Sequence, residues 1–209
     1  MFLLSFAAAT AGEAIREPRV AFSPSGDRVA VELLWTEDGS GFPNARVEIW
    51  DPARGERVGE WSARLTEDES KKGLDGAQAA ARQAAAAELG RANIDLTKPA
   101  TLTACKGGVC GSTEGSGCTG KDQLKVTVTS TPTDSKADQC RTGKPELLAV
   151  SVPEKTWLSE STPADGCPKG YEAAWGALQG ESAVLLVTYA TPSSEGAPNR
   201  VRAVAGRVR

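Results

Sequence analysis

The sequence predicts an α+β fold that is predominantly antiparallel β-sheet, with an N-terminal meander, C-terminal hairpins and one main alanine-rich helix. Three observations lead to this class. Apolar and polar residues alternate between residues 20 and 58, an alanine-rich segment with helix-boundary residues follows at 76–89, and short apolar runs alternate with turns after residue 122. Strands, a helix and then further strands are typical of α+β proteins.

The meander is predicted from period-two apolar patterns separated by turn residues. The runs VAVELLW at 29–35 and VEIW at 47–50 place apolar side chains at every second position, so one face of each strand can be buried. The segments SPSGD at 23–27 and DPARG at 51–55 each combine a proline with a glycine that permits chain reversal. A fourth strand is predicted through 58–61.

The connection from Thr36 to Pro43 is a longer hairpin loop that is predicted to project from one edge of the meander. It contains the candidate binding residues Asp38 and Phe42, since an aromatic side chain in a glycine-rich loop can anchor a partner. The alternative is that Phe42 tucks under the hairpin as a core residue.

The helix is predicted from Gly76 to Leu89. Asp75 is placed to cap its N-terminus, Gln78 completes a capping box, and Gly90 is placed to end it in the left-handed conformation. Small side chains on one stripe favour close packing onto a sheet. The residues of this stripe are Leu74, Ala81, Ala85 and Leu89.

The second half of the chain carries further strand patterns, with proline and glycine at the reversal points between them. The predicted strands are 123–130, 146–152, 182–189 and 200–207.

Composition bounds the chemistry. The chain has 209 residues, 40% of them hydrophobic, which is enough for one sizeable core. Its formal net charge is −3 without a basic stripe, so nucleic acid is not an expected partner. Histidine is absent from the sequence, which excludes Ser-His-Asp triads, Cys-His nucleophiles and zinc-protease helices. We predict no cofactor, no bound metal and no catalytic residue.

Residues 1–11 resemble a signal peptide, since an apolar run leads into the small-x-small pattern of Ala9 and Ala11. The alternative is a buried first strand. No run reaches the roughly 18 apolar residues of a membrane helix. We therefore expect a periplasmic or secreted protein with a single domain at 12–209, which contains a Gly/Cys-rich loop at about 103–121.

Five cysteines lie in the second half, and in an exported protein they indicate disulfides. Cys140 and Cys167 are candidates to staple two distal loops, and two of Cys105, Cys110 and Cys118 are candidates to close a small loop. Connectivity does not follow from spacing. A zinc site is disfavoured because C-x2-C pairs and histidines are both missing.

Two further motifs are weaker. Residues 115–122 nearly spell a phosphate-binding P-loop, but Asp122 replaces the hydroxyl that should meet magnesium, and a strand pattern follows where a helix is needed. The acidic run 67–69 is interpreted as a solvated loop near a helix rather than a calcium site.

Two resemblances are carried by the sequence. The segments FSPSG and IWD resemble one blade of a WD-type or TolB-type propeller, but a propeller needs several blades and one copy is present. The chain as a whole resembles an uncharacterised family of predicted secreted bacterial proteins, which implies export and a compact domain but no known activity. The matching segments are 22–26, 38–43, 167–171, 195–200 and 203–206.

Two classes of function follow. The first is a non-enzymatic binding or structural module whose partner is an envelope or extracellular protein. The second is a carboxylate-based hydrolase acting on a carbohydrate, with an acid/base pair drawn from Glu37, Asp38 and the acidic residues near Trp50 and Trp61.

Overall fold

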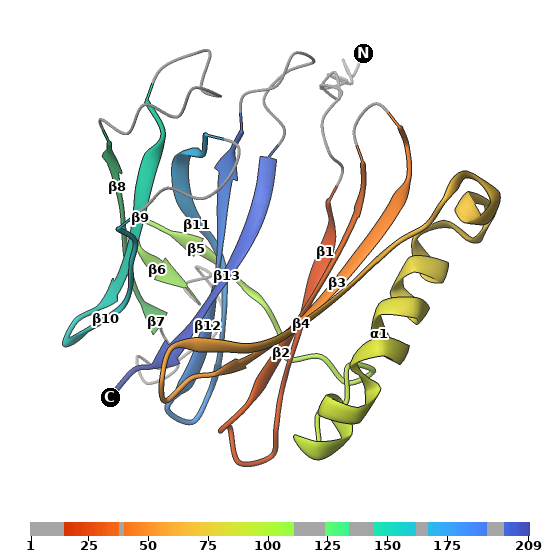
Figure 1. Ribbon diagram of the computed structural model, residues 1–209. Coiled ribbons are helices and arrows are strands. Elements are labelled where there is room, and N and C mark those ends of the chain that lie inside the picture. The colour runs from red at the N-terminus through yellow and green to blue at the C-terminus, as the bar shows by residue number, and fades with distance from the viewer. Residues whose placement is uncertain (1–14, 38–39, 111–123, 134–143, 162–166, 192–198) are drawn as a thin grey trace, which may run out of the picture.

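The computed structural model describes residues 15–37, 40–110, 124–133, 144–161, 167–191 and 199–209, and it confirms an α+β fold that is mostly antiparallel β-sheet (Figure 1). The first sheet, here called the meander sheet, has the order β1-β2-β3-β4. Its strands are β1 (Ile15–Phe22), β2 (Val29–Thr36), β3 (Pro43–Asp51) and β4 (Glu56–Arg64).

Two more sheets form from the second half of the described chain. The middle sheet has the order β13-β12-β11-β5-β6-β7, and the outer sheet has the order β10-β9-β8. The strands of the middle sheet are β13 (Asn199–Arg207), β12 (Ser182–Ala190), β11 (Lys169–Gln179), β5 (Thr103–Lys106), β6 (Val109–Cys110) and β7 (Leu124–Lys125). Those of the outer sheet are β10 (Lys155–Ser159), β9 (Glu146–Val152) and β8 (Thr127–Pro132).

The elements stack as four layers, with α1 (Gly73–Arg91) on the meander sheet, then the middle sheet, then the outer sheet (Figure 1). A separate hydrophobic core fills each of the three interfaces. Ala81 and Val47 belong to the core under α1, Val31 and Leu186 to the core between the meander and middle sheets, and Leu185 to the core against the outer sheet.

Strand β12 is buried on both faces because it lies in the middle layer. Its side chains alternate between cores, with Val184 and Leu186 facing the meander sheet and Ala183, Leu185 and Val187 facing the outer sheet. This explains why apolar residues follow one another without interruption in β12. A strand with one face in solvent would instead alternate apolar and polar residues.

The turn at 23–27 joins two layers. Gly26 has a φ of 71°, which favours glycine, and its carbonyl accepts a hydrogen bond from Ser182 Oγ at 2.6 Å. Gln179 Nε2 donates to the Ser23 carbonyl at 2.8 Å. The turn that resembles a propeller blade therefore docks the meander sheet onto the β11–β12 turn.

The helix is longer than predicted. It begins at Gly73, so Asp75 lies within the first turn rather than at the cap, and the residue at the cap, Lys72, makes no side-chain capping bond. Gly90 lies within the last turn, and the left-handed residue beyond the helix is Asn93, with a φ of 53°. The predicted Asp75 cap and Gly90 terminator are therefore wrong by one helical turn or less at each end.

The predicted buried stripe of α1 is confirmed. Ala81, Ala85 and Leu89 are buried together with Ala77, while Leu74 is partly buried against the same core. Neither α1 nor the preceding 3₁₀ helix η1 (Glu67–Lys72) has the length and apolar character of a bilayer-crossing helix, within the described residues.

The second half differs from the prediction in three places. Strands β10 and β11 were not predicted, the segment expected as one strand at 123–130 forms β7 and β8, and part of the loop expected at 103–121 forms the β5–β6 hairpin. β11 escapes prediction because AAWGAL lacks both β-branched residues and polar alternation. The remainder of that loop, 111–121, lies outside the described residues.

Candidate functional site

The β2–β3 loop is closed by its own backbone. The Glu37 N–H donates to the Phe42 carbonyl at 2.9 Å, and the Gly41 N–H donates to the Glu37 carbonyl at 2.9 Å. Gly41 supports this turn with a φ of 69°. Asp38, a predicted binding residue, lies outside the described residues.

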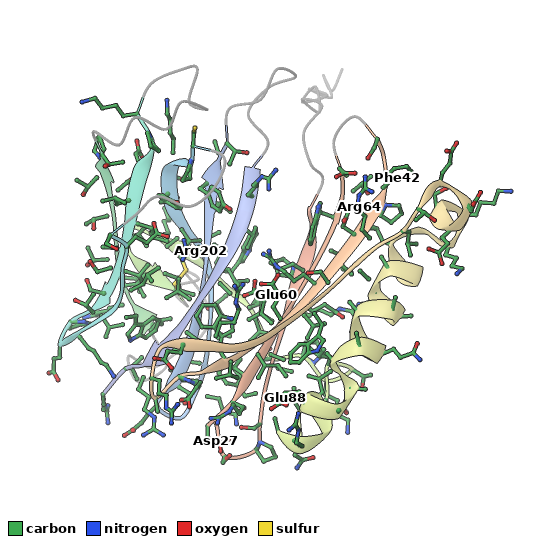
Figure 2. All side chains as sticks on the ribbon, viewed as in Figure 1. Asp27, Phe42, Glu60, Arg64, Glu88 and Arg202 are labelled. Atoms are coloured by element: carbon green, nitrogen blue, oxygen red, sulfur yellow. A yellow bond between two sulfur atoms is a disulfide. The ribbon has the colours of Figure 1, made fainter. Side chains whose placement is uncertain are left out.

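Phe42, the other predicted binding residue, lies under a guanidinium group. The Arg64 Cζ atom stands 4.7 Å from the centre of the Phe42 ring, which is a cation–π arrangement. Figure 2 shows the two side chains together at one end of the meander sheet. Phe42 is half-buried and belongs to none of the three cores.

Glu37 fixes Arg64 in this position. Arg64 Nε donates to Glu37 Oε2 at 3.1 Å, Arg64 Nη2 donates to the same oxygen at 2.5 Å, and Ser40 Oγ also donates to it at 2.5 Å. The hydrogen bonds from Arg64, followed by the one from Ser40, hold the pKa of Glu37 below its usual 4.5. We define Glu37, Ser40, Phe42 and Arg64 as the loop cluster.

The tryptophans of the meander sheet are engaged by charged neighbours. Arg46 Cζ stands 5.7 Å from the centre of the Trp35 ring, and Trp50 Nε1 donates to Glu48 Oε2 at 3.0 Å. Glu48 is buried and also pairs with Arg46 and Arg57. An arginine therefore lies over the Trp35 ring, where a sugar would otherwise stack.

The carboxylates considered for acid/base chemistry are held by cations. Glu37 pairs with Arg64, Glu60 near Trp61 pairs with Arg57, and Asp51 beside Trp50 pairs with Arg28 at 3.1 Å. A general acid needs a raised pKa, whereas Arg64 lowers the pKa of Glu37. The arrangement serves ion pairing better than proton transfer.

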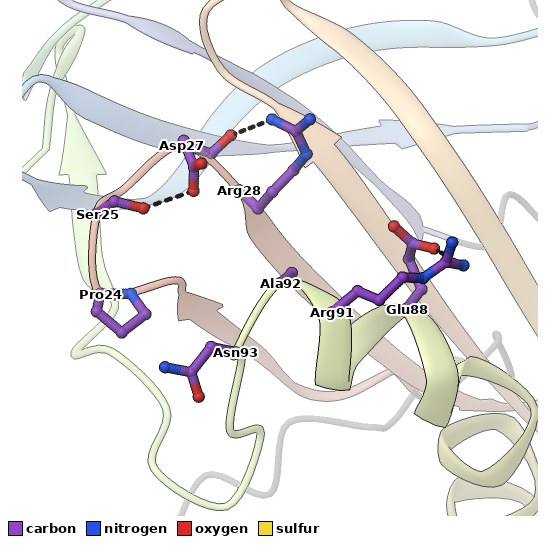
Figure 3. Close-up of a pocket in the computed structure, with 8 residues that line it drawn as sticks. All are labelled: Pro24, Ser25, Asp27, Arg28, Glu88, Arg91, Ala92 and Asn93. Carbon is purple, nitrogen blue, oxygen red and sulfur yellow. Dashed lines mark hydrogen bonds and ion pairs between the residues drawn. The ribbon is translucent and has the colours of Figure 1, made fainter.

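A pocket of about 450 Å³ lies between the 23–27 turn and the end of α1 (Figure 3). Its charged lining is mixed, since Arg91 pairs with Glu88 while Asp27 accepts from Ser25 Oγ at 2.7 Å. Ser23 Oγ donates to the same carboxylate, and the hydrogen bonds from Ser25 and then from Ser23 lower the pKa of Asp27. Sequence reasoning missed this pocket because its lining residues come from two segments some 60 residues apart, without a shared motif. Its residues are Pro24, Ser25, Asp27, Arg28, Glu88, Arg91, Ala92 and Asn93.

Cys105 and Cys110 form a disulfide across the β5–β6 hairpin, with a Cα–Cα distance of 3.9 Å. Cys167 is also disulfide-bonded, while Cys118 and Cys140, and hence the expected Cys140–Cys167 pairing, lie outside the described residues. Among the described residues no three metal-ligating side chains gather.

The structure describes the acidic run 67–69 but not the P-loop-like segment. Residues 67–69 lie in η1, where Glu69 pairs with Lys72 at 3.1 Å. The P-loop-like segment 115–122 lies outside the described residues.

No known protein family, curated protein or solved structure matches this chain. The likeness to a family of predicted secreted bacterial proteins therefore stays a prediction, and the loop cluster must be interpreted from its own geometry.

Proposed function

We propose that this protein is a non-enzymatic binding module of the periplasm or extracellular space, which contacts a protein partner through the loop cluster. The observation that carries the proposal is the position of Phe42, whose half-buried ring is stacked with Arg64 outside every core. An aromatic ring and an arginine held in fixed positions are the side chains that most often dominate binding energy at protein interfaces.

The loop cluster is preorganised, which supports a binding role. Hydrogen bonds to Glu37 hold the Arg64 side chain, and the backbone hydrogen bond from Glu37 holds Phe42 in the loop. Little side-chain entropy is therefore lost when a partner covers them. Arg64 retains 52% of its side-chain exposure, which leaves the guanidinium accessible. Disulfides at Cys105–Cys110 and at Cys167 fit an oxidising compartment.

The proposal is tested by capture from an exported-protein extract. The immobilised wild-type chain is compared with Phe42→Ala, Arg64→Gln and Asp38→Ala, and with Lys155→Ala as a surface control in β10. We expect one captured protein to be lost with Phe42→Ala and weakened with Arg64→Gln, but kept by the control. A capture pattern that is the same for all five proteins would contradict the proposal.

The carbohydrate hydrolase is the alternative proposal, and Glu37 and Glu60 are its acid/base candidates. Glu37 pairs with Arg64, which lowers its pKa and disfavours a general acid, and Glu60 pairs with Arg57. Release of reducing ends from polysaccharide substrates by the wild type, abolished by Glu37→Gln or Glu60→Gln, would favour the hydrolase over the binding module.

A further inference from the structure

Strand β4 is an outer edge of the meander sheet. Among the described elements it contacts β3 and α1, and its residues from 56 to 58 are exposed, with Val58 44% accessible. The opposite edge is different, because the Ala100 N–H donates to the Val20 carbonyl of β1 at 2.7 Å. Open edge strands of this length are templates for pairing with another strand.

The direction of the backbone groups of β4 follows from one hydrogen bond. The Leu65 N–H donates to the Pro43 carbonyl at 3.0 Å, so Leu65 points its backbone groups toward β3. Because these groups alternate along an antiparallel strand, Arg64, Ser62 and Glu60 point theirs away from β3. The register with β3 is unbroken over this stretch, since the irregularity lies between Ile49 and Trp50.

The same three residues also share a face. Trp61 and Ala63 pack against the core under α1, so Glu60, Ser62 and Arg64 project from the other side of the sheet and are exposed. Figure 2 shows Glu60 and Arg64 at separate points along β4.

The order Glu60, Ser62, Arg64 is self-complementary in an antiparallel pairing. When Ser62 lies opposite Ser62 of a second copy, each Glu60 lies opposite the partner's Arg64, which gives two cross-strand ion pairs. A register centred on Glu60 or on Arg64 sets like charges against each other. A register centred on Trp61 places Glu60 opposite Ser62 and forms no ion pair.

Arg64 and Glu60 each have a polar atom that can bond a residue of the second copy. Arg64 uses Nε and Nη2 for Glu37, and no described residue bonds its Nη1. Glu60 uses Oε2 for Arg57, while its Oε1 accepts from Ser62 Oγ at 3.5 Å.

We propose that two copies of this chain pair through β4, in antiparallel register about Ser62, to form one continuous eight-stranded sheet. The pairing shares Arg64 with the loop cluster but does not use Phe42, so Ser62→Pro and Glu60→Arg test the dimer without changing a residue of the loop cluster. A joined sheet also places α1 and its symmetry mate on the same face. The exposed side chains Ala79, Ala80, Gln83, Ala84, Ala86 and Ala87 of α1 carry no charge that would oppose this.

The test is the mass of the full chain by analytical ultracentrifugation at about 100 μM, well above the micromolar range of weak specific interfaces. We expect a dimer for the wild type. Ser62→Pro removes an N–H that points away from β3, so it is expected to give a folded monomer. Glu60→Arg is expected to weaken dimerisation at least about tenfold, because it sets a second guanidinium against Arg64 of the other copy.

The charge swap makes the experiment specific. The double variant Glu60→Arg with Arg64→Glu reverses both partners and is expected to restore the dimer, while Lys155→Ala leaves it unchanged. A wild type that stays monomeric overturns the proposal. So does a dimer that survives both Ser62→Pro and Glu60→Arg, or a folded double variant that remains monomeric.

Discussion

Glu32 shows how a single charged residue is tolerated inside this fold. Its side chain is fully buried between β2 and α1, where Arg82 Nε donates to Oε1 at 2.6 Å and Gln78 Nε2 donates to Oε2 at 2.7 Å. Both carboxylate oxygens are therefore hydrogen-bonded, and the carboxylate is paired with a guanidinium. An otherwise alanine-lined helix gains a polar contact that fixes its position on the sheet.

Removing one member of this pair should destabilise the protein strongly. Arg82→Ala removes the close cation and leaves the buried Glu32 carboxylate with Gln78 and the more distant Arg19, whose Nη1 lies 4.0 Å from Oε2. Breaking a buried pair in this way costs about 3 to 5 kcal/mol. Arg91→Ala is the matched control, because the Arg91 side chain is 74% exposed and its pair with Glu88 contributes about 1 kcal/mol or less. Urea unfolding followed by circular dichroism measures both changes. Equal, small losses would show that the Glu32 pair is not the anchor of α1.

Glu37 gives a pH-dependent signature of the loop cluster. Arg64 and Ser40 lower its folded-state pKa from 4.5, so the bonds they make stabilise the loop above pH 4.5 and are lost as the pH falls through the lower, folded value. Titration of the Glu37 carboxyl by nuclear magnetic resonance should give a pKa below 4.5 that rises toward it in Arg64→Gln. An unchanged value in that variant would remove Arg64 as the cause.

At the scale of elements, the meander was the most predictable part of the chain. Its four strands, its turns and the buried stripe of α1 follow from period and turn chemistry, which are local. The ends of α1 do not, since Asp75 and Gly90 mark its boundaries only to within a turn and packing decides where the helix begins and ends. Phe42 was predictable as a candidate, whereas its stacking with Arg64 depends on the β3–β4 register.

The middle sheet was harder to predict because its contacts are long-range. β11 pairs with β5 through Trp175 and Gly176, some 70 residues along the chain from Ala104 and Thr103. At that point the Cys105–Cys110 hairpin lies directly on Gly176. A Cβ atom on Gly176 would stand 2.9 Å from Cys110 Cβ and 3.0 Å from Cys110 Sγ.

Two glycine substitutions should therefore act in opposite directions. Gly176→Ala forces the disulfide hairpin away from β11, at a cost of about 1 to 3 kcal/mol. Gly90→Ala meets nothing within 4 Å, lies within α1, and should stabilise the protein by about 0.5 to 1 kcal/mol. Thermal and urea unfolding of both variants check the pair. A neutral Gly176→Ala would mean that the hairpin is not held against β11.

The whole molecule is a stack of four layers with a core between each neighbouring pair, and all three described cysteines are disulfide-bonded. Export and oxidation are tested together by the intact mass of the chain from its native host, after free thiols are alkylated. We expect the loss of about eleven N-terminal residues, one alkylated thiol and two disulfides. An unprocessed chain with five alkylated thiols would contradict export.

The placement of β12 between two cores also sets an order of assembly during synthesis. β1 to β4 and α1 are synthesised first and can pair locally. The face of the meander sheet that carries Val29 and Val31 remains exposed to water until β12 and β13 have been synthesised. The outer sheet waits for the same strands. A nascent chain therefore exposes apolar surface through most of its synthesis, which is the stage at which aggregation competes with folding.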